Sequence, residues 1–164
     1  MGPSSTVTGI TLSKNQVSRA TELATASGIN NVKFNVMDAL NMSFPDNSFD
    51  VVWACESGEH MPDKKKYIEE MTRVLKPGGR IVIATWCQRD DRSIPFSNKE
   101  RKILDFLYSE WTHPYFISIE AYAELMKNTG VLEVIKTDDW NKQTIPSWRH
   151  SIWVGVFDPV SYRS

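Results

Sequence analysis

The residues of this chain that are best suited to chemistry lie in one short stretch, residues 48–61, with the sequence SFDVVWACESGEHM. An apolar, largely β-branched run ends there in ionisable and small residues: Cys55, Glu56, Ser57, Gly58, Glu59 and His60. A strand that only filled a hydrophobic core would be expected to end in turn residues such as Asn-Gly. We therefore expect a strand whose carboxyl end opens onto a ligand.

The other strands that the pattern predicts end in a similar way. Short apolar runs occur at residues 7–10, 32–36 and 80–85. The residues that follow these runs are polar, small or aromatic: Thr11 and Leu12, Asp38 and Ala39, and Trp86 and Cys87. Because ligands of an open parallel sheet bind beyond the carboxyl ends of its strands, we expect these residues and Glu56 to converge at one edge. Such a set suits a nucleoside, whose exocyclic amine can donate a hydrogen bond to a carboxylate.

Helical patterns separate the predicted strands. Ser13 stands at a helix N-cap position, Gln16 follows at capping-box spacing, and Gly28 can end that helix. Asp63 can cap a second helix with a regular apolar stripe: Tyr67, Ile68, Met71, Val74 and Leu75. The sequence Lys-Pro-Gly-Gly at 76–79 should then stop this helix. Strands that alternate with helices predict an α/β fold with a parallel sheet.

The second half of the chain is less regular. Residues 99–109 have a helical pattern, and Ser118 can cap another helix that ends at Gly130. Residues 131–136 are predicted to form a fifth strand. The pattern assigns no element to residues 148–157.

The composition limits the possible partners. A chain of 164 residues with 41% apolar and 24% charged residues has the size and composition of one globular domain. Its 19 Lys and Arg against 20 Asp and Glu give a net charge of −1, which argues against nucleic acid or an anionic membrane as partner. No apolar run approaches the roughly 20 residues that span a bilayer, so we expect no integral membrane segment.

Cysteine and histidine are sparse. Cys55 and Cys87 are too few for a disulfide framework, which favours a soluble protein in a reducing intracellular compartment. They are expected to end neighbouring strands, but a metal site needs more ligands, and we expect no metal. His113 and His150 are interpreted as ordinary surface or core histidines.

Several segments resemble a known family: GITLS (9–13), DALNMSFPDNSFDVVW (38–53), ESGEHMPDK (56–64), RVLKPGGRIVIATWC (73–87) and TDDW (137–140). They are similar to class I S-adenosylmethionine-dependent methyltransferases and, among these, to the γ-tocopherol methyltransferases of photosynthetic organisms. The resemblance covers about residues 7–148. The acidic strand end and LKPGG are general to the superfamily, whereas ESGEHMPDK with the later TWC is narrower.

The resemblance implies two sets of site residues. The cofactor S-adenosyl-L-methionine would be bound by Thr11, Leu12, Gln16, Asp38, Ala39, Glu56 and Ser57. Glu59 and His60 would face the methyl acceptor as catalytic residues. The residues alone leave alternatives open, since Asp38 could instead cap the turn that follows it and Gln16 could simply complete a capping box. His60 could equally have a structural role at the entry of the next helix.

The chain departs from the family pattern at its beginning. A strand and a glycine-rich loop normally precede the GITLS segment by about 25 residues, and no such sequence stands upstream of Val7. The expectation is a single partial methyltransferase domain over residues 1–164, truncated at both ends. Residues 7–90 would form its cofactor-side half, and residues 91–164 its acceptor-side and C-terminal part.

This departure has physical consequences. The resemblance implies an α/β, Rossmann-like methyltransferase sheet that lacks its first, central strand, so strands 7–10 and 49–54 should lose their shared partner. Unpaired edges of this kind can lead to self-association. Without the loop, which would hold the methionine end of the cofactor, this chain alone is expected to bind the cofactor weakly or not at all and to be inactive.

The resemblance favours C-methylation of a tocopherol-like phenol, a small-molecule aromatic acceptor. The alternatives are N-methylation of an alkaloid or another small amine, and a catalytically inactive fragment or pseudo-enzyme that binds a partner through its open sheet edges. A plastid or the cytoplasm is the expected location, although no transit peptide is visible in the sequence.

Overall fold

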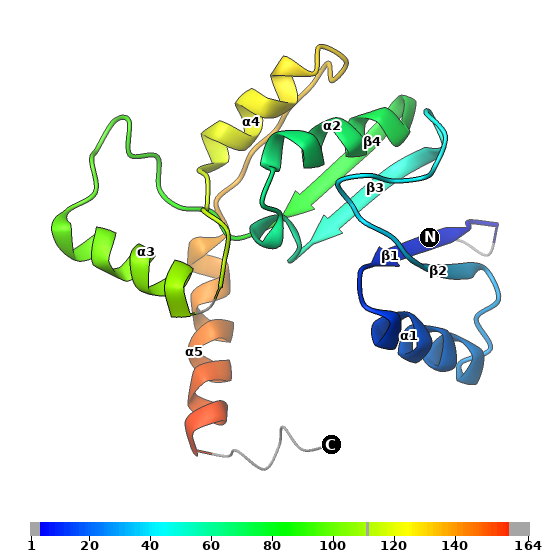
Figure 1. Ribbon diagram of the computed structural model, residues 1–164, viewed down its shortest axis with the longest axis horizontal. Coiled ribbons are helices and arrows are strands. Elements are labelled where there is room, and N and C mark those ends of the chain that lie inside the picture. Colours follow the sequence, from blue (N-terminus) through cyan, green and yellow to red (C-terminus); the bar gives the residue numbers. More distant parts are fainter. Residues whose placement is uncertain (1–3, 111, 158–164) are drawn as a thin grey trace. The chain divides into compact units, whose positions relative to one another are not determined.

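The computed structural model describes residues 4–110 and 112–157. The chain divides into two compact units, Met1–Glu133 and Val134–Ser164. The first unit contains all of the strands of the described residues, and the second contains one helix (Figure 1).

The first unit begins with a strand–helix–strand segment. Its elements are β1 (Val7–Thr11), α1 (Lys14–Ala26) and β2 (Val32–Val36). The strands are parallel and in register, with Val7 opposite Val32 and Thr11 opposite Val36. Both predicted strands and the helix between them are confirmed.

A second segment of the same kind follows. Its elements are β3 (Phe49–Cys55), the short 3-10 turn η1 (Gly58–His60), α2 (Lys64–Val74) and β4 (Leu75–Ala84). β3 and β4 are parallel, and their register shifts between Phe49 and Val51, whose partners are Leu75 and Arg80. The Lys-Pro-Gly-Gly segment is therefore an irregular part of β4, and this strand begins earlier than the predicted residue 80.

Three predicted helix N-caps have the expected geometry. The side chains of Ser13, Asp63 and Ser118 each accept a hydrogen bond from the backbone N–H three residues later, at 3.3, 2.8 and 3.1 Å. Each of these bonds satisfies an N–H group that has no partner within its helix. Gly28 ends α1 with a φ of 67°, a left-handed conformation that glycine adopts without strain.

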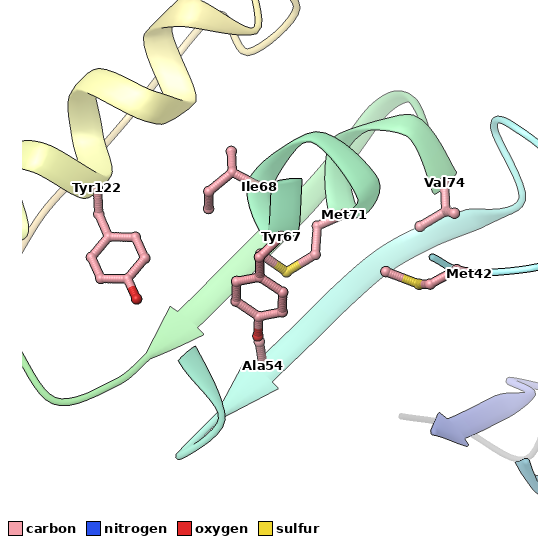
Figure 2. Close-up of a cluster of buried hydrophobic side chains, with 7 residues drawn as sticks. All are labelled: Met42, Ala54, Tyr67, Ile68, Met71, Val74 and Tyr122. Atoms are coloured by element: carbon pink, nitrogen blue, oxygen red, sulfur yellow. The ribbon is translucent and has the colours of Figure 1, made fainter. Parts of the chain in front are cut away.

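The hydrophobic core lies where α2 packs against β3 and β4. Four of the five predicted stripe residues lie in α2 and are almost completely buried: Tyr67, Ile68, Met71 and Val74. The fifth, Leu75, is also buried but is the first residue of β4. Figure 2 shows the four side chains of α2 together with Met42, Ala54 of β3 and Tyr122 of α4. Burial of each large apolar side chain stabilises the fold by about 1.5–3 kcal/mol.

The remaining elements are helices. They are α3 (Asn98–Glu110) and α4 (Ile119–Asn128) in the first unit, and α5 (Asn141–Phe157) in the second. The fifth strand that we predicted at residues 131–136 is wrong, since these residues form no strand. Val131 and Val134 are 64% and 75% exposed, so this apolar run has no neighbouring strand on which to pack.

The sheet is divided into two pairs of strands. Among the described residues, β1 pairs only with β2, and β3 pairs only with β4. The strand pairing is thus as expected for a sheet in which β1 and β3 lack a common neighbour. In the described part of the chain, we find no helix long and apolar enough to cross a membrane.

Candidate functional site

The carboxyl ends of β1 and β2 lie next to each other. The backbone N–H of Met37 donates to the carbonyl of Thr11 at 3.0 Å, which fixes the segment after β2 beside the end of β1. Ile10, Met37 and Ala39 also pack against the core cluster of Figure 2, which contains Ala54 near the end of β3. These contacts place the segment after β2 beside the end of β1 and pack both against the core to which β3 contributes Ala54.

Thr11 and Gln16 are joined by a direct side-chain contact. The Thr11 hydroxyl donates to Oε1 of Gln16 at 2.6 Å, and the Ser13 N–H donates to the same hydroxyl at 3.2 Å. The Gln16 side chain therefore holds Thr11 and does not complete the capping box with Ser13. Leu12, the next residue of this segment, is 73% exposed.

Asp38 makes the turn contact that we had considered as an alternative. Its Oδ1 accepts from the Leu40 N–H at 2.8 Å, and its carbonyl accepts from the Asn41 N–H at 3.1 Å. Its second carboxylate oxygen makes no hydrogen bond to any residue that the structure describes. Asp38 thus caps its turn and keeps an oxygen available for a ligand.

Glu56 has a strained backbone at the end of β3. Its φ is 51°, a left-handed value that is uncommon for residues other than glycine, while its N–H donates to the Ala84 carbonyl at 2.8 Å. The indole Nε1 of Trp86 donates to Oε2 of Glu56 at 2.8 Å. Strained residues of this type cluster at ligand sites, where the surrounding structure holds them in place.

Ser57 and Glu59 face inward from the loop between β3 and α2. The Ser57 hydroxyl and the Tyr67 hydroxyl are 2.9 Å apart and share a hydrogen bond. Glu59 is only 2% exposed, and its Oε2 accepts from the Thr85 hydroxyl at 2.6 Å. Because Glu59 is buried, its carboxylate supports this loop from the protein interior. Its catalytic role stays a prediction.

A buried lysine supports the same loop. Lys64 is 7% exposed, and its ammonium group donates to the backbone carbonyls of Glu59 at 3.1 Å and Met61 at 2.6 Å. Burial lowers the pKa of Lys64, and the nearby Glu59 opposes this shift. Burial also raises the pKa of Tyr67, so its hydroxyl stays neutral at physiological pH.

Gly58 allows this loop to lie close to β4 and α4. A Cβ atom at Gly58 would lie 2.7 Å from the Thr85 hydroxyl oxygen and 3.0 Å from the Tyr122 hydroxyl oxygen. The first distance is shorter than side-chain packing permits and the second is unusually tight, so only glycine fits here without movement of its neighbours. In the stretch ESGEH, the side chains of Glu56 and His60 are thus exposed, whereas the side chain of Glu59 is buried and holds the loop in place.

His60 is exposed in η1, after the end of β3, and its ring stacks on that of His113. We had interpreted His113 as an ordinary surface or core histidine, and nothing in its sequence context signals the contact. His113 follows α3, far from the strand ends in sequence, and only the fold brings it to His60. Among the described residues, no group of three or more His, Cys, Asp or Glu side chains is arranged to hold a metal ion.

Comparison with known proteins identifies the family. Residues 1–83 match the model of the methyltransferase domain. The chain belongs to this methyltransferase family. Its α/β fold is therefore the Rossmann-like methyltransferase fold, in an incomplete form.

The similarity extends to individual curated relatives. Over 157 residues, 95% of this chain and 49% of the relative, the chain is 49% identical to a 2-methyl-6-phytyl-1,4-hydroquinone methyltransferase of Synechocystis. It is 42% identical over 85% of its length to a chloroplastic tocopherol O-methyltransferase of Arabidopsis thaliana, of which it covers 41%. The chain thus spans about half the length, or less, of the curated relatives it matches.

A solved structure shows the same fold. Geranyl diphosphate methyltransferase in complex with SAM superimposes with a TM-score of 0.64 at 25% identity. The match covers 76% of this chain and 48% of that protein. The resemblance to tocopherol-type methyltransferases that the motifs indicated is confirmed.

Proposed function

We propose that this protein transfers a methyl group from S-adenosyl-L-methionine to a ring carbon of a tocopherol-like phenol. The observation that carries the proposal is the set of groups at the strand ends. The last residue of β1 carries a hydroxyl, a carboxylate with an available oxygen follows β2, and a carboxylate on a strained backbone follows β3. The 49% identity to a phytyl-hydroquinone methyltransferase supports the choice of acceptor.

The donor set at these strand ends suits the cofactor. Asp38 would accept a hydrogen bond from the adenine amino group, with Ala39 beside the ring. Thr11, oriented by Gln16, and Leu12 would line the ribose and the methionine part. When bound, S-adenosyl-L-methionine supplies a methyl group that is already activated by the positive charge on sulfur.

Glu56 and Ser57 would border the cofactor sulfur. The Trp86 indole fixes the Glu56 carboxylate, and the Tyr67 hydroxyl fixes Ser57, so neither group has to reorganise when a ligand binds. Groups that are held in place before the reaction stabilise charge more effectively than mobile ones.

The acceptor side requires a base. A phenolic ring carbon becomes more nucleophilic as the phenol hydroxyl loses its proton, and a ring nitrogen of His60 is suited to accept that proton. His60 is exposed, whereas Glu59 is buried behind it against Thr85. We therefore assign proton transfer to His60 and support of the loop to Glu59.

Cofactor binding can be tested by NMR. ¹⁵N-labelled chain would be titrated with S-adenosylhomocysteine up to millimolar concentration, because we expect weak binding. Shift changes confined to the amides near Thr11, Asp38 and Glu56 would support the site. Changes confined to other amides would contradict it and favour a non-catalytic protein.

The acceptor can be tested by methyl transfer from radiolabelled cofactor in a full-length protein that contains this sequence, because the chain alone is expected to be inactive. Three acceptors would be compared: 2-methyl-6-phytyl-1,4-hydroquinone, γ-tocopherol and an indole alkaloid. Labelled phenol carbon supports the proposal, whereas transfer to the alkaloid nitrogen alone supports the N-methyltransferase alternative. His60→Ala should abolish transfer to the phenol, and His150→Ala should not.

We also propose that the chain self-associates through the edges of β1 and β3. Among the described residues, β1 pairs only with β2 and β3 only with β4, so each strand has one unpaired edge. Unpaired strand edges favour association. Size-exclusion chromatography with light scattering should give a discrete dimer. A monomer at all concentrations would contradict this proposal.

A plastid or cytoplasmic location is a further proposal. It is supported by the name of the Arabidopsis thaliana relative, which is described as chloroplastic. Fluorescence microscopy of a tagged chain in its own cells would test it, and a secreted product would contradict it.

A further inference from the structure

Aromatic side chains surround a second imidazole beside the site. The rings of His113 and His60 are stacked, with centroids 4.9 Å apart and planes inclined by 21°. Trp86 and Phe116 lie 5.6 and 5.4 Å from the His113 ring. His113 is therefore bordered by rings from η1, from the segment after β4 and from its own segment before α4.

Stacking, rather than hydrogen bonding, holds the two imidazoles. Nδ1 of His113 is buried, and no described residue is hydrogen-bonded to it. The His60 ring likewise makes no hydrogen bond to the part of the chain that the structure describes. Since a histidine usually has its orientation fixed by a bond at one ring nitrogen, the orientation of His60 here depends on the ring against which it packs.

The position of His60 makes this contact relevant to the site. Both of its neighbours on the chain are held by hydrogen bonds. The Glu59 carboxylate accepts from the Thr85 hydroxyl, and the Met61 carbonyl accepts from the Lys64 ammonium group. The backbone of His60 is thus fixed while its ring remains at the surface. Trp86 contacts the His113 ring and donates a hydrogen bond to Glu56, so it links the histidine pair to the end of β3.

We propose that His113 is a positioning residue that sets the orientation of the His60 imidazole toward the methyl acceptor. The inference rests on the proposed function only for the role of His60 as proton acceptor. The stack leaves both nitrogens of His60 without a hydrogen bond to the described residues, and one of them can then take the proton of a phenol hydroxyl. His113 acts through His60 and needs no contact with the acceptor.

NMR of the imidazole rings tests the contact directly, because the chain has only three histidines. In the unaltered chain, the ring protons of His60 and His113 should show a nuclear Overhauser effect. His113→Ala should shift the ring signals of His60, whereas His150→Ala, a matched change in α5, should leave them in place. His113→Phe retains a ring to stack on and should restore a single set of sharp His60 signals.

A water-soluble probe separates this proposal from the proposed function. Methylhydroquinone would be titrated into the chain and into the His113→Ala and His113→Phe variants, with the His60 ring signals as readout. We expect the alanine variant to bind the probe several-fold more weakly and the phenylalanine variant to recover most of the affinity. If the unaltered chain binds no probe but the Overhauser effect and the shift are present, the proposed acceptor fails and the positioning contact stands.

Two results would overturn the inference. One is the absence of the Overhauser effect between His60 and His113 in the folded, unaltered chain, which needs no variant. The other is an unchanged His60 spectrum in folded His113→Ala. If His113→Ala does not fold, the Overhauser measurement and His113→Phe decide the question.

Discussion

The buried carboxylate of Glu59 and the hydroxyl of Thr85 are joined by a 2.6 Å hydrogen bond. Glu59 belongs to the loop after β3, and Thr85 follows β4, so the bond ties the carboxyl ends of two neighbouring strands together. The nearest exposed residues before and after Glu59 are Glu56 and His60, which we assign to the cofactor and to the acceptor. The bond therefore provides rigid support directly beneath the candidate site.

Removal of this hydroxyl should destabilise the fold. Thr85→Val retains the shape of the side chain but leaves the Glu59 carboxylate buried without its donor, which should cost about 1–3 kcal/mol in the free energy of unfolding. Urea unfolding followed by circular dichroism measures this. Thr25→Val, an exposed change on α1, should alter stability by less than about 0.5 kcal/mol. Equal effects of the two changes would contradict the anchoring role.

Acid should weaken the packing of α2 through Glu70. The Glu70 carboxylate accepts from Arg73 and from the Met42 N–H, and the pKa of Glu70 falls to about 2, mainly because of the hydrogen bond from Arg73. Its ordinary value is 4.5, so the folded state has the lower pKa. The stabilisation, up to about 3 kcal/mol, is therefore complete above the ordinary value and is lost as the pH falls toward 2.

The Glu70→Gln variant should lack this pH dependence of stability. We expect it to be less stable than the unaltered chain at pH 7 and to lose less stability between pH 5 and pH 3. Urea unfolding across this pH range is the measurement. Glu69→Gln alters an exposed neighbour that pairs with Lys65 and should keep the original pH dependence. A Glu70→Gln curve parallel to that of the unaltered chain would show that the carboxylate does not carry the effect.

Substitution of Glu56, which has a left-handed backbone, should affect ligand affinity more than the stability of the fold. Glu56→Gly removes a strain of about 1 kcal/mol but also removes the acceptor of the Trp86 hydrogen bond, so the two effects should offset each other and the melting temperature should change little. The same change should reduce the affinity for S-adenosylhomocysteine. Asn47→Gly is a matched control, because Asn47 has a φ of 55° in a turn outside the candidate site. It should leave ligand affinity unchanged; a similar loss of affinity in both variants would count against a role for Glu56.

A methyl group at Gly58 should disturb the loop by steric overlap. Gly58→Ala places an atom 2.7 Å from the Thr85 hydroxyl oxygen, and overpacking of this kind costs about 1–3 kcal/mol. Thr85→Ala removes that oxygen, so Gly58→Ala should cost less in the Thr85→Ala background. A double-mutant cycle measured by urea unfolding gives this coupling. Additive effects would mean that the loop moves away from β4 without strain.

Local signals in the sequence were sufficient for much of the fold. The N-caps at Ser13, Asp63 and Ser118 and the apolar stripe of α2 depend on residues only a few positions apart. Such features can be recognised from spacing, because neighbours along a helix or strand are also neighbours in space. The apolar run at 131–136 misled us, since β-branched residues predict a strand only where another strand is available to pair with it.

The sequence by itself determined that this chain is an α/β protein with acidic and polar residues at its strand ends, and its motifs were sufficient for the family. Only the tertiary structure decided that Glu59 turns inward to Thr85, that Gln16 holds Thr11, and that His113 stacks on His60. Strand ends are specified by short-range patterns of burial and turn formation. The direction of each side chain at those ends depends on partners that the fold brings in from distant parts of the chain, and no spacing in the sequence records them.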